Sequence, residues 1–386
     1  MSKWKEIVFS DLFSEGTRNG VFKTNGKPVV DARLIGMGTL FHNDFIRRSP
    51  EETLGLTADE YARFSVRAGD LLFGRRSLVE SGAGKVSLVV AVDSPTVFES
   101  SLIRVRLDPS KADPRFYAYY FKAGVGRGRI FALVNGAAVK GIRSSDLQKV
   151  VVHWPPLPIQ KRIADILSAY DDLIENNRRR MEILEESARL IYWKMFGGKK
   201  ANGTKMPLSE LADVVMGQSP ESSTYNEDGV GLPFHQGVAG FGDRYPINEK
   251  WCTAGSRFAE EGDVLFSVRA PVGRINVSRE KIVIGRGLAA MRAKNGCQSW
   301  LLHTLKNHFS KEDMIGVGCI FASTTKKELF SVELFVPPEV EIEKFEREVA
   351  PMDEQIRVLT DVNLKLAKAR DMLLSKLMNG RGEYGC

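Results

Sequence analysis

The sequence is poor in the residues that hold metals or form disulfides. Its five histidines form no i,i+4 pair, and its four cysteines lie far apart, at Cys252, Cys297, Cys319 and Cys386. Neither a disulfide framework nor a zinc site is indicated. No run of apolar residues approaches the roughly 18–20 needed to span a bilayer. Since the chain opens on the polar stretch 1–6 without an apolar signal region, we expect a cytoplasmic protein without a membrane partner.

Recognisable catalytic motifs are also lacking. The stretch 82–85, Gly-Ala-Gly-Lys, has Val79 where a phosphate-binding loop needs its first glycine, and Val86 replaces the Ser or Thr. The glycines of 124–128 have the wrong intervals for a dinucleotide turn. No nucleophile elbow and no Asn-Pro-Pro-Tyr or Asp-Pro-Pro-Tyr tetrapeptide of an amino-methyltransferase occurs. We therefore expect no catalytic residue, metal or cofactor in this chain.

A basic excess is present instead. The 386 residues include 55 Lys and Arg against 48 Asp and Glu, a net charge of +7 with a pI of about 9.1. This balance favours a polyanionic partner such as nucleic acid.

The strongest pattern is a long helix that occurs twice. After Pro155-Pro156 the chain runs to Phe196 without Gly and with no Pro beyond Pro158, and its apolar positions recur in alternating steps of four and three, as in a coiled coil. This seam consists of Ile163, Leu167, Tyr170, Ile174, Asn177, Met181, Leu184, Ala188, Ile191 and Met195.

A second seam lies 182 positions further on, after Pro337-Pro338. It consists of Phe345, Val349, Met352, Ile356, Leu359, Asn363, Leu366, Arg370, Leu373 and Leu377. The polar members Asn177, Asn363 and Arg370 are of the kind that fixes register. We interpret the seams as the core of a helix pair within one chain, and the 182-residue interval as an internal repeat.

The repeat predicts an α+β protein that contains one module twice. We expect strand-rich domains at 1–154 and 199–336, long helices at 155–198 and 337–380, and a tail at 381–386. Both domains contain a Gly-Asp turn that leads into an apolar strand, at Gly69 and Gly262. The stretch from Gly217 to Trp251 has no convincing counterpart in the first half.

Candidate binding residues lie in loops of both copies. Arg and Gln pair with guanine and adenine edges, whereas Lys, Ser and Thr commonly hold phosphates. On this basis we expect contacts to DNA from Arg75, Arg76, Lys85, Lys140, Arg143, Gln218, Ser219, Gln236, Arg244, Arg269, Arg274, Arg286, Ser323 and Lys326.

These features together resemble the specificity (S) subunit of a type I restriction-modification system over nearly all of the chain. The stretch 155–164, Pro-Pro-Leu-Pro-Ile-Gln-Lys-Arg-Ile-Ala, resembles the helix-entry signature of that family, and the strands after Gly69 and Gly262 resemble its recognition domains. The second helix entry, 337–343, departs from the signature because it lacks the Gln and is more acidic.

The resemblance implies that two antiparallel helices join two target-recognition domains with pseudo-two-fold symmetry. Each domain is then expected to read one half of a bipartite double-stranded DNA target, with the helices setting the spacer. It also implies two methyltransferase (M) subunits that bind S-adenosylmethionine, with or without two restriction (R) subunits that use ATP and Mg²⁺, in a prokaryotic cytoplasm.

Two other functions stay open from the residues alone. A coiled-coil adaptor that recognises proteins predicts no salt-dependent DNA binding, whereas phosphate neutralisation demands a steep dependence on salt. A self-sufficient DNA-modifying enzyme predicts binding of S-adenosylmethionine by the isolated chain.

Overall fold

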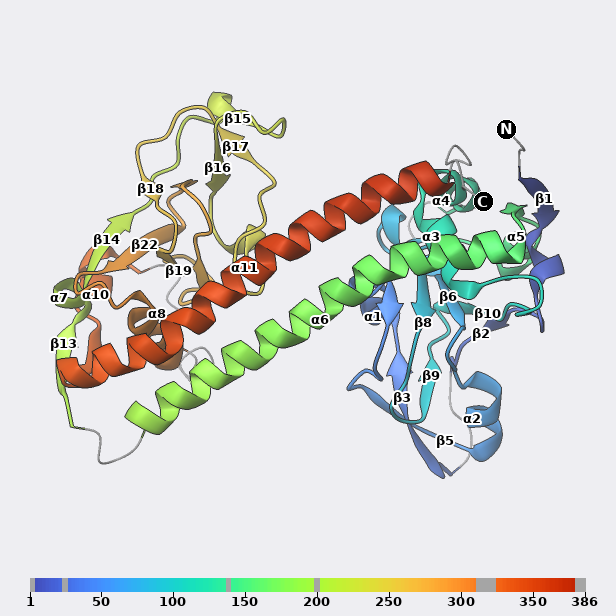
Figure 1. The fold of residues 1–386 in the computed structure, drawn as a ribbon, viewed down its shortest axis with the longest axis horizontal. Helices are drawn as coiled ribbons and strands as arrows, with labels where there is room; N and C mark the ends of the chain where they lie inside the picture. Colours follow the sequence, from blue (N-terminus) through green and yellow to red (C-terminus); the bar gives the residue numbers. More distant parts are fainter. Residues whose placement is uncertain (1–3, 23–26, 137–139, 198–201, 310–323, 379–386) are drawn as a thin grey trace. The chain divides into compact units, whose positions relative to one another are not determined.

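The computed structural model describes residues 4–22, 27–136, 140–197, 202–309 and 324–378 (Figure 1). The chain divides into two compact units, which we describe one at a time. Unit 1 comprises residues 1–175 and 363–386, and unit 2 comprises residues 176–362. Each unit therefore contains one α+β domain together with a part of both long helices. Within the described ranges, no helix is long and apolar enough to cross a membrane.

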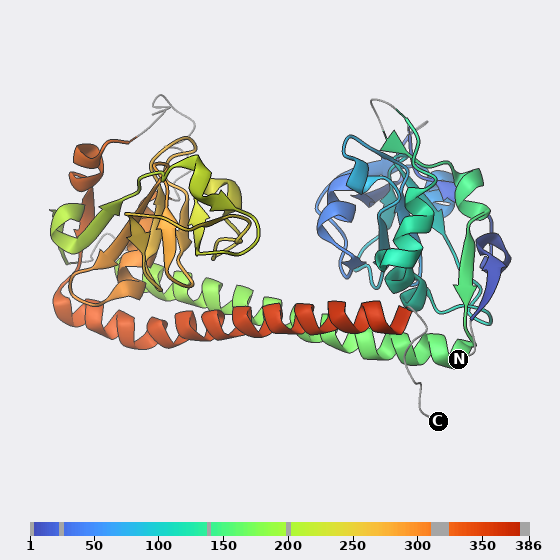
Figure 2. The same ribbon diagram turned by 90° about the horizontal axis from the view of Figure 1, so that it is seen from above.

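The two long helices are α6 (Leu157–Phe196) and α11 (Glu339–Met378), each of 40 residues. In unit 1 the Asn363 amide donates to the Ile174 carbonyl at 3.2 Å, and in unit 2 the Thr360 hydroxyl lies 3.4 Å from the Met181 sulfur. From the first contact to the second, the residue number in α6 rises from 174 to 181, while the residue number in α11 falls from 363 to 360. In each unit the helices therefore run antiparallel, side by side (Figures 1 and 2).

The predicted seam lies on the packed side of both helices. Each of its twenty positions is buried or half-buried. Near the helix ends the seam also enters the domain cores: Ile163 and Leu167 join the core of unit 1, and Phe345 and Val349 join that of unit 2. The helices therefore pack against the domains as well as against each other. The interruption at Asn363 has a clear role, because its amide bonds across the pair.

Unit 1 consists of short strands with helices against them. Its strands are β1 (Lys5–Val8), β2 (Arg18–Asn19), β3 (Val30–Ile35), β4 (Phe45–Ile46), β5 (Thr53–Leu56), β6 (Leu71–Gly74), β7 (Arg76–Ser77), β8 (Val86–Val89), β9 (Thr96–Phe98), β10 (Leu102–Val105), β11 (Lys140–Gly141) and β12 (Val151–Trp154). Its helices are α1 (Met37–His42), α2 (Ala58–Phe64), α3 (Pro114–Lys122), α4 (Gly124–Phe131) and α5 (Ser144–Gln148). The sheets have the orders β2-β10-β6-β8-β4, β5-β3-β9, β11-β7 and β1-β12.

Unit 2 repeats this plan. Its strands are β13 (Thr204–Pro207), β14 (Ala212–Met216), β15 (Tyr225–Asn226), β16 (Leu232–His235), β17 (Trp251–Cys252), β18 (Phe258–Ala259), β19 (Val264–Ser267), β20 (Ile275–Val277), β21 (Ile282–Ile284), β22 (Leu288–Ala293) and β23 (Glu333–Val336). Its short helices are α7 (Leu208–Leu211), α8 (Gln298–Phe309) and α10 (Lys326–Phe330). The sheet order β14-β22-β19-β20 corresponds to β2-β10-β6-β8 of unit 1.

The Gly-Asp turns show why the sequence repeats here. Gly69 and Gly262 have φ of +91° and +85°, a conformation that favours glycine. In unit 1 the Asp70 carboxylate accepts the Arg67 N–H at 2.9 Å and the Arg106 Nε at 2.7 Å. In unit 2 Asp263 likewise accepts from the Glu260 N–H at 2.8 Å and the Arg292 Nε at 2.6 Å. One carboxylate thus closes the turn and ties it to a neighbouring strand.

Candidate nucleic-acid interface

In unit 2, backbone hydrogen bonds join the ends of several strands around the turn 285–287, and we call this set of hydrogen bonds the frame of the unit. The Gly217 N–H donates to the Leu288 carbonyl at 2.9 Å, and the Gln218 N–H donates to the Ile284 carbonyl at 3.0 Å. The Gly285 N–H donates to the His235 carbonyl at 2.8 Å. The ends of β14, β16 and β21 therefore meet at the turn Gly285–Gly287.

The same frame exists in unit 1, although the sequence showed no counterpart for the stretch after Gly217. There the Gly20 N–H donates to the Leu102 carbonyl at 3.3 Å, the Val21 N–H to the Phe98 carbonyl at 2.8 Å, and the Glu99 N–H to the Ile35 carbonyl at 3.0 Å. A Cβ on Gly20 would lie 2.1 Å from the carbonyl oxygen of Phe98, and a Cβ on Gly217 would lie 2.1 Å from the carbonyl oxygen of Gly285. Gly217 and Gln218 thus correspond to Gly20 and Val21, and His235 corresponds to Ile35, which corrects the expectation from the sequence at these positions of the stretch 217–251.

Four of the expected binding residues of unit 2 gather at its frame: Gln218, Ser219, Gln236 and Arg286. The Ser219 hydroxyl donates to the Gln236 side-chain oxygen at 2.9 Å, and the Arg286 backbone N–H lies 3.4 Å from the same hydroxyl. Gln218, Gln236 and the Arg286 side chain are exposed. One arginine and two carboxamides, which have the donor and acceptor groups that read base edges, are therefore presented together.

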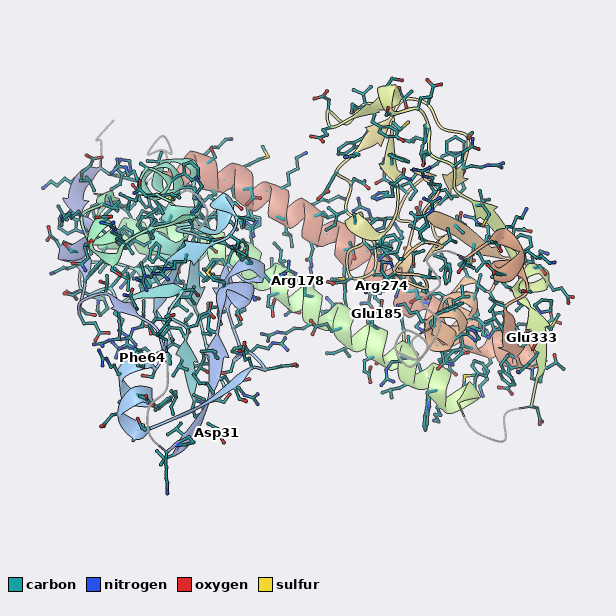
Figure 3. All side chains as sticks on the ribbon, turned by 180° about the vertical axis from the view of Figure 1, so that it is seen from behind. Asp31, Phe64, Arg178, Glu185, Arg274 and Glu333 are labelled. Atoms are coloured by element: carbon teal, nitrogen blue, oxygen red, sulfur yellow. The ribbon has the colours of Figure 1, made fainter. Side chains whose placement is uncertain are left out.

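The hairpin loop between β19 and β20 adds cations beside this frame. The Val268 N–H donates to the Gly287 carbonyl at 2.9 Å, so the exposed Arg269 follows directly from the frame. Arg274 is also exposed and is labelled in Figure 3. The Thr324 N–H donates to the Val268 carbonyl at 2.8 Å, and this leads to the exposed Lys326 of α10.

The equivalent loop in unit 1 carries Arg75 and Arg76. The Arg75 N–H donates to the Ser101 carbonyl at 2.7 Å, and its guanidinium donates to the Ser100 carbonyl at 3.2 Å, so this half-buried arginine is partly held by the frame. Arg76 is exposed and lies opposite Gly141 in the β7–β11 ladder. The same ladder carries the half-buried Lys140, and the exposed Arg143 lies three residues after Lys140.

Within the described part of the chain, no carboxylate pairs with the cations at these two frames: Arg76, Lys140, Arg143, Arg269, Arg274, Arg286 and Lys326. Their charge is therefore available to an anionic partner. In the same ranges, no three His, Cys, Asp or Glu side chains gather as a metal site requires.

Two expected contacts to DNA have structural roles instead. Arg244 is 8% exposed and is paired with Glu185 of α6 and, at 2.7 Å, with Asp353 of α11. Although burial alone would lower the pKa of Arg244, the charges of Asp353 and Glu185 raise it. The Lys85 ammonium donates to the Phe41 carbonyl at 2.6 Å and lies 3.5 Å from Asp44. These contacts within the fold use the charges of Arg244 and Lys85 and argue against a place for either residue in the interface, whereas Ser323 lies outside the described residues.

Sequence reasoning missed the turn residues Ser100 and Ser101. They are the counterparts of Arg286 and Gly287, since the Leu102 N–H donates to the Glu99 carbonyl at 3.0 Å just as the Leu288 N–H donates to the Gly285 carbonyl at 3.0 Å. Two serines between a Glu and a Leu give no signal of their own, and only the backbone pattern identifies them.

Two copies of one α+β domain, each packed on an antiparallel helix pair and each with cations in loops near its strand ends, define the class of two-domain recognition subunits. Residues 1–186 match the family described as type I restriction modification DNA specificity domain. The chain is 29% identical, over 98% of its length and 93% of the relative, to the MjaX type I restriction enzyme specificity subunit of Methanocaldococcus jannaschii. It is 24% identical to the MjaVIII specificity subunit of the same organism, over 51% of this chain and 45% of that one.

The fold is similar to a crystal structure of the S subunit of a type I restriction-modification system from M. genitalium. That comparison has a TM-score of 0.62 at 18% identity and covers 97% of this chain and 96% of the other. The chain is thus similar to type I restriction-modification specificity subunits, in sequence over nearly its whole length and in fold. The matched family describes a DNA specificity domain, and these relatives are named specificity subunits.

Proposed function

We propose that this chain selects a bipartite DNA target, with each domain reading one half. The observation that carries this proposal is the pair of equivalent frames. Both present cations that no carboxylate of the described residues pairs with, but their side chains differ, with Ser100 where the other frame has Arg286. A repeated backbone with different side chains is what two different half-sites require, because base edges are read by side-chain donors and acceptors.

The two long helices supply the second part of the proposal, the docking of two M subunits. Both helices carry large apolar side chains that are exposed, among them Ile183 (66%) and Trp193 (63%) on α6 and Val340 (70%) and Met372 (58%) on α11. Exposed apolar side chains of this kind mark protein contacts. S-adenosylmethionine would be bound by the M subunits, and ATP with Mg²⁺ by R subunits where these join the complex, in the cytoplasm of a prokaryote.

The helices are also proposed to set the spacer between the half-sites. Four residues inserted at matched points in both helices would lengthen each by about 6 Å, or roughly two base pairs. The measurement is the spacer of the methylated motif when this variant replaces the original chain in cells that contain the M subunit. A methylated motif that retains its original spacer would contradict this part of the proposal.

The main test is methylation mapping after co-expression with the M subunit in a host without adenine methylation. A bipartite motif is expected.

Arg286→Ala should then relax sequence preference in one half-site and weaken binding by about 1–3 kcal/mol, because a guanidinium that reads a base edge is lost. Arg357→Ala is a matched control, since this arginine is paired with Glu354 of its own helix at one turn's spacing. Equal loss of preference in both half-sites, or salt-independent binding, would contradict the proposal.

A further inference from the structure

The loop between β6 and β8 of unit 1 exposes two apolar side chains beside its cations. It spans eleven residues, 75–85, whereas the equivalent loop between β19 and β20 of unit 2 spans seven, 268–274. Leu78 is 86% exposed and Val79 is 51% exposed. At the corresponding place after the strand, unit 2 has the exposed sequence Arg269-Ala270-Pro271. The longer loop thus adds an apolar tip, Leu78-Val79, that unit 2 lacks.

Hydrogen bonds connect the base of this loop. The Val79 N–H donates to the buried Ser77 hydroxyl at 3.1 Å, and the Val79 carbonyl accepts the Gly82 N–H at 3.1 Å. Arg127 of α4 donates to the carbonyls of Ala83 at 3.1 Å and Ser81 at 2.7 Å. The loop is therefore closed by its own backbone and by Arg127, and its conformation does not depend on burying Leu78.

Close packing fixes the same base. A Cβ on Gly82 would lie 2.3 Å from the Phe41 ring, and a Cβ on Gly84 would lie 2.2 Å from the Ile130 side chain. Gly84 also has φ of +67°, which favours glycine. This packing restricts the base of the loop, while the side chains of the tip, Leu78 and Val79, stay exposed to water. Exposing a leucine in this way is unfavourable unless a partner covers it.

The cations around the tip indicate which partner this is. The exposed Arg76 precedes Leu78 by two residues, and the β7–β11 ladder places Lys140 opposite Ser77. A partner that touches the tip is therefore anionic and also offers an apolar surface. DNA has both features, because phosphates line its grooves and thymine methyl groups or unstacked base faces lie within them.

We propose that Leu78, supported by Val79, makes an apolar contact with the bases of one half-site, and that the other half-site has no such contact. This inference rests on the proposed function, since it assumes that unit 1 reads DNA. It deepens that function by assigning an apolar element of specificity to one domain. The ligand is a thymine methyl group or the face of an unstacked base, and the experiment separates the two.

The test uses the full chain in complex with its M subunit and DNA duplexes in which one or the other half-site is scrambled. Leu78→Ala should weaken binding of the intact target about tenfold, because much of a leucine side chain returns to water. The effect should vanish on one scrambled duplex and persist on the other.

The salt dependence of DNA binding should stay unchanged in Leu78→Ala, whereas Arg76→Gln should reduce the slope of this salt dependence by about one. Val29→Ala, at another exposed apolar residue of unit 1 (70%), is the matched control and should bind as the unaltered chain does.

Two further arms identify the apolar surface. Replacing thymine by uracil in the half-site should weaken the unaltered complex but not the Leu78→Ala complex if a methyl group is touched. A rise in 2-aminopurine fluorescence that Leu78→Ala abolishes would identify an unstacked base. Unchanged binding by Leu78→Ala, or loss of M-subunit association in place of DNA affinity, would overturn the inference. Absence of sequence-selective binding by the unaltered complex would instead overturn the proposed function.

Discussion

The two units anchor their domains to the long helices at the same position of the repeat, but with different chemistry. Asp171 and Asp353 are 182 residues apart, and each is a poorly exposed acid on a long helix. In unit 1 Asp171 accepts the Tyr119 hydroxyl of α3 at 2.5 Å and is paired with Arg370 of α11. In unit 2 Asp353 is paired with Arg244 at 2.7 Å and lies 3.8 Å from His303 of α8.

The two copies of the module share some features of this anchor and differ in others. Tyr119 and His303 occupy equivalent positions, since each lies six residues after the residue that precedes its helix, Asp113 or Cys297. The cation differs more, because Arg370 comes from the partner helix and Arg244 comes from the domain itself. A buried carboxylate must be compensated, but any nearby donor can do this. The position of the acid is therefore shared while its partners diverge.

The largest expected difference between the two anchors comes from removing the cation. Arg244→Ala should destabilise unit 2 by about 3–5 kcal/mol, because it removes a buried guanidinium and leaves the half-buried Asp353 and Glu185 without their shared partner. Arg370→Ala should cost about 1.5–3 kcal/mol, because Asp171 retains the Tyr119 hydroxyl. Hydrogen–deuterium exchange of each unit measures both changes. Equal loss of protection around α3 and α8 in the two variants would show that the anchors are equivalent after all.

The sequence predicted the scaffold well because a heptad seam has a fixed interval. All twenty seam positions are packed, and the 182-residue repeat locates both anchoring acids. The frames escaped detection because their intervals vary. Gly217 follows Gly20 by 197 residues, whereas Gly285 follows Glu99 by 186, since loops of different length separate the strands. No comparison at constant spacing can align them.

Arg244 was misassigned for a related reason. It follows Gly242 and Asp243 in a segment that reads as a surface loop, and its burial depends on Glu185 and Asp353, 59 and 109 residues away in the sequence. Residue type and local pattern indicate where a charge is, but only tertiary contacts show whether it is used inside the fold. Arg286 and Arg76 have similar local patterns and stay exposed.

A second expected difference between the two units is their stability at acidic pH. Burial would raise the pKa of Asp353, but His303 and Arg244 outweigh it and hold this pKa below its ordinary value of 3.8. For Glu185, burial is likewise outweighed by Arg244 and Lys306, so its pKa lies below 4.5. A carboxylate whose pKa is lowered by folding stabilises the folded state fully at pH values above its pKa in the unfolded chain. This stabilisation is lost as the pH falls through its pKa in the folded chain. Unit 2 should therefore lose stability as pH falls below about 4.5.

Arg244→Met tests this pH dependence by removing the main cation. Thermal unfolding between pH 3 and pH 7 should then change less with pH than in the unaltered chain, because both carboxylates lose a cause of their low pKa. Arg357→Met is the control, because its partners Glu354 and Asp361 are more exposed and its removal should leave the slope of unit 2 almost unchanged. A slope that is identical in all three proteins would mean that the buried cluster does not control acid stability.

The smallest expected effect tests whether the neutral donor of unit 1 matters. Tyr119→Phe removes a hydroxyl that donates to Asp171 at 2.5 Å and keeps the ring in the core beside Phe45. Burial and the nearby Asp171 raise the pKa of Tyr119, so the hydroxyl stays protonated and acts as a donor at every pH of interest. Since Arg370 still compensates the acid, the loss should be about 1 kcal/mol and independent of pH between 5 and 8. The free energy of unfolding in urea, with Tyr61→Phe as the control at a half-buried tyrosine of the same unit, measures it. A loss as large as that of Arg370→Ala would mean that the hydroxyl and the guanidinium compensate Asp171 as one network, and the two anchors would then be more alike than their side chains indicate.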